Sequence, residues 1–258
     1  EEAKREHLLV ASANWAATGW MVSKMFRDCI VVDTGSTSTS IIPIINRKIA
    51  AEGKTDMEKL ANGELVYTGA LRTNVAAIVS CVPLRGRMLR VSSEFFAQSG
   101  DVHLVLEHIS EEEYHVDTAD CRGKTRVEAM ARLARVVCAD IEMLNHSELT
   151  DMAQYIYERQ VEQISQALTQ VYLRVRRQVM DNIPVVVTGI GRKFLGKRAA
   201  EQIGLKNIVD LGERLGSHVA SATPSVGVAL MAAEMFEGGI QWKPQLRLEG
   251  AYPKTRLL

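Results

Sequence analysis

Two short apolar stretches joined by a turn of small residues constrain the fold of this chain more than any other feature. CIVVD at 29–33 and SIIPII at 40–45 are rich in β-branched residues, as buried strands are. Because the connection between them is short, the sequence predicts a β-hairpin. Pro43 cannot donate a ladder hydrogen bond, so we expect the second strand to lie at an edge or to bend there.

The rest of the chain alternates between strand-like and helix-like segments, which is typical of the α/β class. An apolar face that includes Val127 and Leu144 predicts one helix at 126–144, and a longer helix is predicted at 148–181. The segment 183–191 is predicted to be a strand that ends in glycines. Further predictions are a short helix that opens with the capping box of Thr55 and Glu58, a strand resuming at 64–70, a helical stretch at 101–110, a strand at 207–211 and a helix at 223–236.

The composition narrows the classes of function. The chain has 258 residues, of which 47% are hydrophobic and 24% charged, as in an ordinary globular protein. Its 31 basic and 31 acidic side chains balance, so we expect no nucleic-acid partner and no membrane contact. The four cysteines form no C-x-x-C pair, which predicts free thiols in a reducing cytoplasm. The balanced charge and the long helix permit a homo-oligomer without showing one.

The turn between the first two strands has the composition of a phosphate site. The first strand delivers Asp33 to its end, and Gly35 allows a tight turn and a close approach of the backbone to a ligand. Amides and hydroxyls of the next residues can surround an anion, and the Asp33 carboxylate can hold a divalent cation, directly or through water. A tight hairpin that is merely rich in turn formers is the alternative. The candidate phosphate-binding residues are Thr34, Gly35, Ser36, Thr37, Ser38 and Thr39.

A second glycine turn follows the strand within VVVTGIGRKFLG at 185–196. A strand that ends in Gly189 and Gly191 and opens a helix can receive a phosphate group. The next glycine is Gly196, so the dinucleotide pattern G-x-G-x-x-G is not met, and this stretch contains no G-K-[ST] of a P-loop. Close packing of a strand against a helix is the alternative explanation for these glycines.

Three charged residues between the two turns are further candidates. Arg72, within NGELVYTGALRT at 62–73, can bind a phosphate through its planar guanidinium group. Glu64 in the same stretch and Glu94 in SSEFF are candidate general bases. Surface salt bridges are the alternative for both stretches. The histidines, aspartates and cysteine between 103 and 121 match no zinc-binding spacing.

Six stretches follow one another along the chain in an order that is informative about the family. They are DTGSTSTSIIPI, NGELVYTGALRT, VSSEFFA, RLARVVCAD, VVVTGIG and TPSVGVALMAAE. Together they resemble the hydantoinase/oxoprolinase-like branch of the sugar kinase, heat-shock-protein and actin superfamily. Within it they are most similar to an archaeal family of methanofuran biosynthesis, also described as tetrahydromethanopterin-linked C1-transfer pathway proteins. The resemblance covers about residues 8–236.

The resemblance implies a fold of two duplicated, ribonuclease-H-like α/β lobes around a cleft. The first lobe of the family starts with a phosphate turn of the form D-I-G-G-A-N-T-K, which does not occur here, so the resemblance implies a truncated N-terminal lobe. The implied division is a remnant of that lobe at 1–30, a phosphate-hairpin lobe with a helical insertion at 31–182, part of a C-terminal lobe at 183–238 and a tail at 239–258 that we expect to be disordered.

The resemblance also implies a reaction, in which an aminomethyl-furanmethanol diphosphate is joined to gamma-glutamyltyramine. The phenol oxygen displaces pyrophosphate and forms an aryl ether. In this hypothesis Asp33 binds Mg²⁺, the hairpin turn holds the diphosphate, Arg72 balances its charge and the second glycine turn lines the opposite wall. Glu64 or Glu94 accepts the phenol proton, whose pKa is about 10. An ATP-dependent kinase or hydrolase of the same superfamily, and a non-catalytic nucleotide-binding regulator, are the alternatives, because a shared fold does not fix function.

Overall fold

A mixed β-sheet forms the centre of the structure, a computed structural model that describes residues 13–179 and 182–236. The strand order is β3-β2-β1-β7-β8, and β4 also pairs with β2. β2 is antiparallel to β1, whereas β7 is parallel to β1 and to β8. The predicted α/β class is therefore confirmed. The strands are β1 (Cys29–Thr34), β2 (Thr39–Ile45), β3 (Lys48–Ile49), β4 (Leu65–Val66), β7 (Val185–Thr188) and β8 (Ile208–Asp210).

The predicted hairpin is present as β1 and β2, which pair along their whole lengths up to Thr34 and Thr39. All six residues of β1 are buried, as its run of β-branched residues indicates. Pro43 lies in β2 between the short stretches that pair with β3 and β4. Its carbonyl accepts a hydrogen bond from the Ala50 amide, on the side away from β1. The expected edge position is wrong for the strand, because β2 lies between β1 and β3. The missing N–H of Pro43 instead falls between the stretches that pair with β3 and β4.

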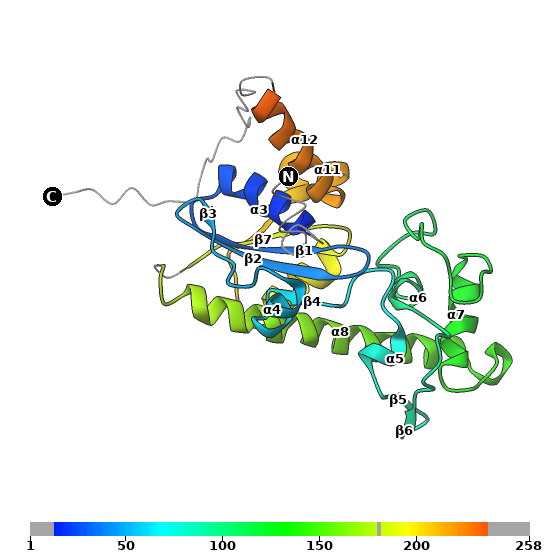
Figure 1. Ribbon diagram of the computed structural model, residues 1–258. Helices are drawn as coiled ribbons and strands as arrows, with labels where there is room; N and C mark the ends of the chain where they lie inside the picture. Colours follow the sequence, from blue (N-terminus) through cyan, green and yellow to red (C-terminus); the bar gives the residue numbers. More distant parts are fainter. Residues whose placement is uncertain (1–12, 180–181, 237–258) are drawn as a thin grey trace.

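Helices cover both faces of this sheet (Figure 1). β1 supplies side chains to both cores. Ile30 and Val32 pack in the larger core, which is built around α8 (His146–Val175). α8 lies below the sheet in Figure 1. Cys29 and Val31 pack in a second core, together with side chains of α3 (Asn14–Met25). α12 (Thr223–Phe236) packs against α3 on the same face. Because side chains alternate along a strand, Asp33 belongs to the face of α3 and Thr34 to the face of α8.

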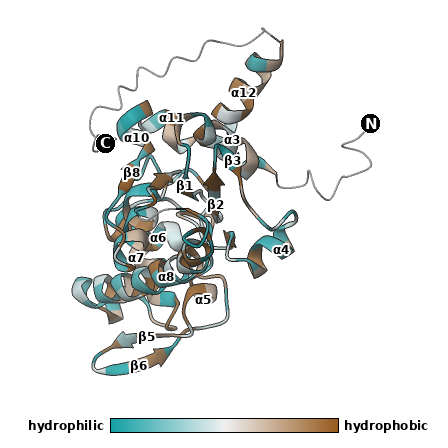
Figure 2. Ribbon diagram, turned by 90° about the vertical axis from the view of Figure 1, so that its left-hand side faces the viewer, coloured by the Kyte–Doolittle hydropathy of each residue, from teal (hydrophilic) through white to brown (hydrophobic). Residues whose placement is uncertain are grey.

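Shorter elements surround the sheet and the helices on its two faces. Figure 2 shows that the β5–β6 hairpin projects at the end of the molecule opposite to α12. This small sheet is separate from the central one. The remaining elements are α4 (Asp56–Ala61), α5 (Val75–Ile78), β5 (Cys81–Leu84), β6 (Arg87–Arg90), α6 (Ser99–Val105), α7 (Arg126–Arg135), a 3₁₀ helix (Ile141–Met143), a π-helix (Arg192–Gly196), α9 (Lys197–Gln202), α10 (Leu211–Leu215) and α11 (Ser217–Ser221).

The prediction of one helix at 126–144 is wrong. α7 ends at Arg135, and the backbone then turns at Cys138, where φ is +58°. Val127, expected on the buried face, is 65% exposed. The other boundaries also move, because α6 ends at Val105, α8 ends at Val175 and β4 contains only two residues.

Several local predictions are confirmed. Thr55 caps α4 in a capping box with Glu58, and the final helix begins at Thr223 as expected. None of the helices in the described parts of the chain is long and apolar enough to cross a bilayer. The predicted tail at 239–258 lies outside the described residues, as do residues 1–12 of the predicted remnant. The division of the chain at 30 and 182 stays a prediction; β1 and β7, on either side of 182, share one sheet.

Candidate active site

The parallel pairing of β1 with β7 brings the hairpin turn and the glycine turn to the same edge of the sheet. Asp33 lies opposite Thr188 in the register, so both strands end there. The Gly191 amide donates a 3.0 Å hydrogen bond to the Thr34 carbonyl and ties the two turns together. Two turns that lie far apart in the sequence therefore border one region.

The hairpin turn presents backbone donors that nothing in the described part of the chain uses. The Gly35 amide donates to the Ser38 carbonyl across the turn at 2.9 Å. The amides of Ser36, Thr37 and Ser38 donate no hydrogen bond within that same part of the chain. These residues are half-buried, and the hydroxyl oxygens of Ser36 and Thr37 lie 3.4 Å apart. Consecutive free amides at a turn form a concave site for an anion.

The segment that follows β4 holds the carbonyl side of this turn. The Ala70 amide donates to the Gly35 carbonyl, and the amides of Leu71 and Arg72 both donate to the Ser36 carbonyl, each at 2.9 Å. The carbonyls of Gly35, Ser36 and Ser38 are thus satisfied within the protein, while the three amides from Ser36 to Ser38 are left for a ligand. The same bonds place Arg72, whose side chain is exposed, directly beside the turn.

The carboxylate of Asp33 lies buried beside the turn, with only 8% of the residue exposed. The Thr18 hydroxyl on α3 donates a 2.9 Å hydrogen bond to its Oδ2. Burial raises the pKa of Asp33 from 3.8 to about 6, and the bond from Thr18 offsets part of that rise. Such a cost in desolvation is typical of a functional carboxylate.

Gly189 packs closely against the end of β1, beside this carboxylate. Its φ is +87°, which favours glycine, and an added Cβ would collide with the Thr34 carbonyl. The same Cβ would lie 2.8 Å from Oδ1 of Asp33. A Cβ on Gly191 would lie 2.5 Å from the Thr34 methyl group. Close packing against β1 accounts for both glycines.

The Asp33 carboxylate fits a magnesium site in which phosphate oxygens and water supply the other ligands. The described residues contain no group of three or more His, Cys, Asp or Glu side chains placed to hold a metal ion. Mg²⁺ in phosphate sites takes one or two carboxylates, with phosphate oxygens and water as its other ligands. Asp33, whose Oδ1 accepts no hydrogen bond from the described residues, meets that requirement.

Two predicted phosphate-binding hydroxyls belong to the protein interior instead. Thr39 is fully buried, and its hydroxyl donates a 2.9 Å hydrogen bond to the Thr68 carbonyl. The hydroxyl of Thr34 is buried on the other face of the sheet from Asp33 and has no hydrogen-bond partner within the described residues. The residues that border the open side of the turn are therefore those from Gly35 to Ser38.

The two candidate bases are not brought into contact with the turn. Glu64 is fully buried and accepts hydrogen bonds from the amides of Glu52 and Gly53 at 2.8 and 2.9 Å, and it pairs with Arg174 of α8. These contacts anchor a loop. Glu94 lies in the segment between β6 and α6, where its side chain is exposed. The structure records no contact between either carboxylate and the described residues of the turn.

Comparisons with known proteins agree with this arrangement. A family model described as hydantoinase/oxoprolinase matches residues 1–235. This chain belongs to the hydantoinase/oxoprolinase family. The predicted family is thereby confirmed.

Two relatives of the chain carry the same name, (4-{4-[2-(gamma-L-glutamylamino)ethyl]phenoxymethyl}furan-2-yl)methanamine synthase. The one from Methanocaldococcus jannaschii is 40% identical over 238 residues, which are 92% of this chain and 69% of the relative. The one from Methanococcus vannielii is 35% identical over 207 residues, which are 80% of this chain and 90% of the relative.

A solved structure of nucleotide-free acetone carboxylase, described as an ATP-dependent enzyme, has a similar fold, with a TM-score of 0.53 at 12% identity. The match covers 84% of this chain but only 31% of that one, so this member of the hydantoinase/oxoprolinase family spans about a third of the larger protein. At this identity the likeness concerns the fold alone.

Sequence reasoning missed the ion pair that supports the glycine turn in this member of the family. The buried guanidinium of Arg192 pairs with Asp210 at 3.0 Å and donates to the Gly189 carbonyl at 3.2 Å and to the Ser217 hydroxyl at 3.0 Å. Asp210 also accepts from the Gly212 amide at the start of α10. The available signals were an arginine directly after the glycines and an aspartate at the end of a strand, but nothing in the sequence pairs them.

Proposed function

We propose that this chain carries the diphosphate site of an enzyme that joins an aminomethyl-furanmethanol diphosphate to gamma-glutamyltyramine and releases pyrophosphate. The shared name of the two relatives, a phenoxymethylfuran synthase, supports this reaction because it describes an aryl ether of a furan. The structural observation that carries the proposal is the hairpin turn, with free amides at Ser36, Thr37 and Ser38 beside the buried Asp33.

The turn and its neighbours would bind the leaving diphosphate. The free amides and the hydroxyls of Ser36 and Thr37 donate to its oxygens, and the exposed guanidinium of Arg72 balances its charge. Asp33, whose Oδ1 accepts no hydrogen bond from the described residues, would hold Mg²⁺. When bound, the ion would neutralise the charge that builds up on the departing pyrophosphate. Because the furan ring stabilises positive charge at the methylene carbon, a dissociative path suits this site.

The phenol must lose a proton as the ether forms. Its pKa is about 10, so a nearby carboxylate would assist as a general base. Glu64 already accepts two backbone hydrogen bonds and an ion pair. Glu94 is exposed and lies shortly before Gln98, which forms a bridge with Asn74 near the turn segment. Of the two carboxylates, we therefore favour Glu94 for this role.

We also propose that the mixed sheet is part of a pair of ribonuclease-H-like lobes of the actin, sugar-kinase and heat-shock-protein kind. In this proposal 31–182 is the phosphate-hairpin lobe and 183–238 belongs to the C-terminal lobe. A cleft between the lobes would enclose the substrates. All four cysteines are unpaired, which supports a reducing cytoplasm, and a homo-oligomer is compatible with this arrangement.

The reaction is tested with the full-length protein, both substrates and Mg²⁺, with mass spectrometry to detect the ether and a coupled assay to detect pyrophosphate. We expect ether and pyrophosphate in equal amounts, and loss of turnover in Asp33→Asn. Turnover by Asp33→Asn at the wild-type rate would contradict the metal role. Formation of ADP from ATP without any furan substrate would favour the kinase alternative, and tight nucleotide binding without any product would favour the regulator.

A further inference from the structure

Gln160 lies fully buried in the middle of α8, behind the segment that supports the hairpin turn. We propose that Gln160 is a positioning residue for the diphosphate turn, and that His103 on α6 sets the direction of its side-chain amide. This inference rests on the proposed function, because it assigns a purpose to contacts directly behind the same turn.

The first step is the dependence of the turn on the segment 69–72. Three amides of this segment bind the carbonyls of Gly35 and Ser36. Gly69 packs so tightly that an added Cβ would lie 2.6 Å from the carbonyl carbon of Thr37 and 2.7 Å from the Ser38 nitrogen. A shift of the segment would therefore move the turn, and with it the free amides that bind the diphosphate.

The second step is the hold of Gln160 on this segment. Its Nε2 donates to the Gly69 carbonyl and to the Thr68 hydroxyl oxygen, both at 2.8 Å. The Thr68 hydroxyl in turn donates to the hydroxyl oxygen of Thr73 at 3.3 Å. The same Thr73 oxygen also accepts a 2.9 Å hydrogen bond from the Gly69 amide. One side-chain amide thus fixes the start of the segment. Because every partner is buried, water cannot replace a lost bond without cost.

The third step is the direction of the Gln160 amide. The Gly69 carbonyl can only accept, so Nε2 must point toward it and Oε1 must point toward His103. Oε1 lies 3.0 Å from Nε2 of His103, which therefore carries the proton. Burial lowers the pKa of His103 to about 3, so the ring stays neutral and its Nδ1 is an acceptor. Nδ1 of His108 lies 3.1 Å away and donates to it. Both histidines thus have fixed tautomers.

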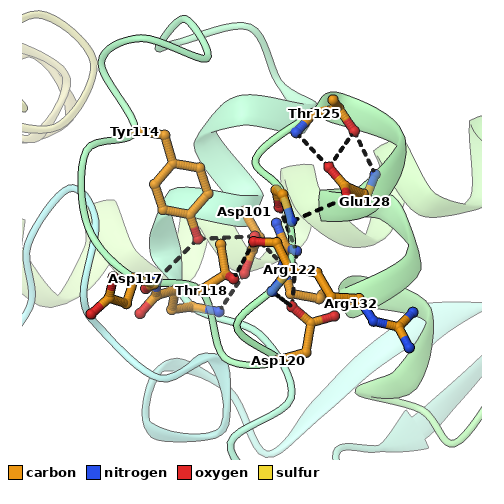
Figure 3. A network of polar contacts seen from close by, with 11 residues as sticks. Asp101, Tyr114, Asp117, Thr118, Asp120, Arg122, Thr125, Glu128 and Arg132 are labelled. Atoms are coloured by element: carbon orange, nitrogen blue, oxygen red, sulfur yellow. Dashed lines mark hydrogen bonds and ion pairs between the residues drawn. The ribbon is translucent and has the colours of Figure 1, made fainter.

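The fourth step is the rigidity of the helix that carries His103. Figure 3 shows the buried network at the start of α6, where Tyr114 and Arg132 both point toward the Asp101 carboxylate. Nε of Arg132 lies 2.7 Å from Asp101 Oδ1, and the Tyr114 hydroxyl donates to it at 2.9 Å. The Ser99 hydroxyl of the same helix accepts from the Thr73 amide at 3.1 Å. α6 therefore supports the turn segment directly through Ser99 and indirectly through His103.

The test uses the full-length protein and the variant Gln160→Met, which keeps the length of the side chain but can neither donate nor accept strongly. The matched control is Gln163→Met on the same helix, which removes a single bond to the Ile78 carbonyl. Affinity for inorganic pyrophosphate with Mg²⁺ is measured by calorimetry, and amide hydrogen exchange is measured over 35–38 and 68–73. We expect Gln160→Met to bind pyrophosphate about tenfold more weakly than the control, with faster exchange in both segments.

A second pair of variants separates the role of His103 from its packing. His103→Gln retains an N–H donor for Oε1 of Gln160, whereas His103→Phe fills the space between Tyr157 and Phe194 without donating. We expect His103→Gln to retain most of the wild-type pyrophosphate affinity and His103→Phe to lose affinity about as Gln160→Met does. This pair decides the question if Gln160→Met fails to fold.

The outcomes are distinguishable from a failure of the proposed function. If the wild-type protein binds no pyrophosphate, the proposed function is wrong and this inference falls with it. If the wild-type protein binds pyrophosphate and Gln160→Met binds it equally well, only this inference is overturned. Equal affinities for His103→Gln and His103→Phe would overturn the part that concerns the direction of the amide.

Discussion

The hydroxyl of Thr18 donates a buried hydrogen bond of 2.9 Å to Oδ2 of Asp33, across the gap between α3 and the end of β1. The bond favours the ionised carboxylate, whereas burial opposes ionisation and has the larger effect, since the pKa of Asp33 is raised to about 6. The protein thus keeps a charge that costs stability at neutral pH. A bound cation would offset that cost, so the stability of this site is linked to its ligand.

Asp33→Asn should stabilise the ligand-free protein at alkaline pH. A folded-state pKa raised above the unfolded value contributes stability that is present below about 3.8 and is lost as pH rises through about 6. The variant escapes that loss, so we expect it to be more stable by up to about 3 kcal/mol near pH 8. Urea unfolding near pH 4 and near pH 8 measures the difference. An advantage that did not shrink at low pH would contradict this prediction; Asp117→Asn, at an exposed position, is the control.

Thr18→Val should raise the pKa of Asp33 further. The valine side chain has nearly the same shape as threonine but cannot donate to Oδ2, so the carboxylate loses its hydrogen-bond partner. We expect an upward shift of about one unit, which a ¹³C NMR titration of the carboxyl group measures. The acid limb of Mg²⁺-dependent pyrophosphate binding should move to higher pH with it. Ser23→Ala, which removes a hydroxyl from the same helix, should leave both unchanged.

Gly189→Ala should destabilise the protein far more than Gly204→Ala. Both glycines have positive φ, +87° and +80°, but only at Gly189 would the added Cβ meet other atoms. We expect a loss of about 3–5 kcal/mol at 189 from strain plus collision, and about 1–2 kcal/mol at 204 from strain alone. Urea unfolding of both variants gives the comparison. Equal losses would show that the turn relaxes away from Thr34.

Arg192→Met should leave Asp210 as an uncompensated buried charge. The guanidinium group also loses its bonds to the Gly189 carbonyl and the Ser217 hydroxyl. We expect a loss of about 3–5 kcal/mol in the free energy of unfolding. Arg198→Met removes an exposed arginine that lies 4.0 Å from Glu201 and should cost less than about 0.5 kcal/mol. We expect faster amide hydrogen exchange at 189–191 in Arg192→Met but not in Arg198→Met.

Arg72→Ala should weaken ligand binding without affecting stability. The side chain is exposed, so we expect the free energy of unfolding to stay within about 0.5 kcal/mol of wild type. The affinity for pyrophosphate should fall about tenfold, since a charge-assisted bond to phosphate is lost. Calorimetry at two salt concentrations measures this loss. Arg87→Ala, on the separate β5–β6 hairpin, is the matched control, and an equal loss there would show that the effect is one of net charge.

The parts of the fold that the sequence predicts correctly are those with local causes. The hairpin follows from two runs of β-branched residues, and the start of α4 follows from the reach of Thr55 to Glu58. The prediction of one helix at 126–144 is wrong because the apolar spacing continues through Val137 and Ile141. These two residues still pack on the core after the backbone has turned. The spacing of apolar residues indicates which side chains are buried, but buried side chains need not belong to one continuous helix.

The parts of the candidate site that the sequence predicts correctly also have local causes, whereas the missed parts depend on contacts between distant residues. Asp33 and the turn are adjacent in the sequence and could be predicted together. Glu64 is a candidate because it lies near Arg72 in the sequence, but its carboxylate pairs with Arg174 of α8 instead. Gln160 bonds to Gly69 across 91 positions, and no local pattern marks such a pair. Contacts of this kind depend on the packing of α8 against the sheet.

The bond from the Gly191 amide to the Thr34 carbonyl has a consequence for synthesis on the ribosome. β1 and β2 emerge early and can pair at once, but β7 can join them only after the whole crossover through α8 has been made. Until then Asp33 lies at an open edge, and closing so long a loop is entropically costly. The nascent chain therefore possesses its hairpin well before its finished site, which appears only after β7 and Gly191 have left the exit tunnel.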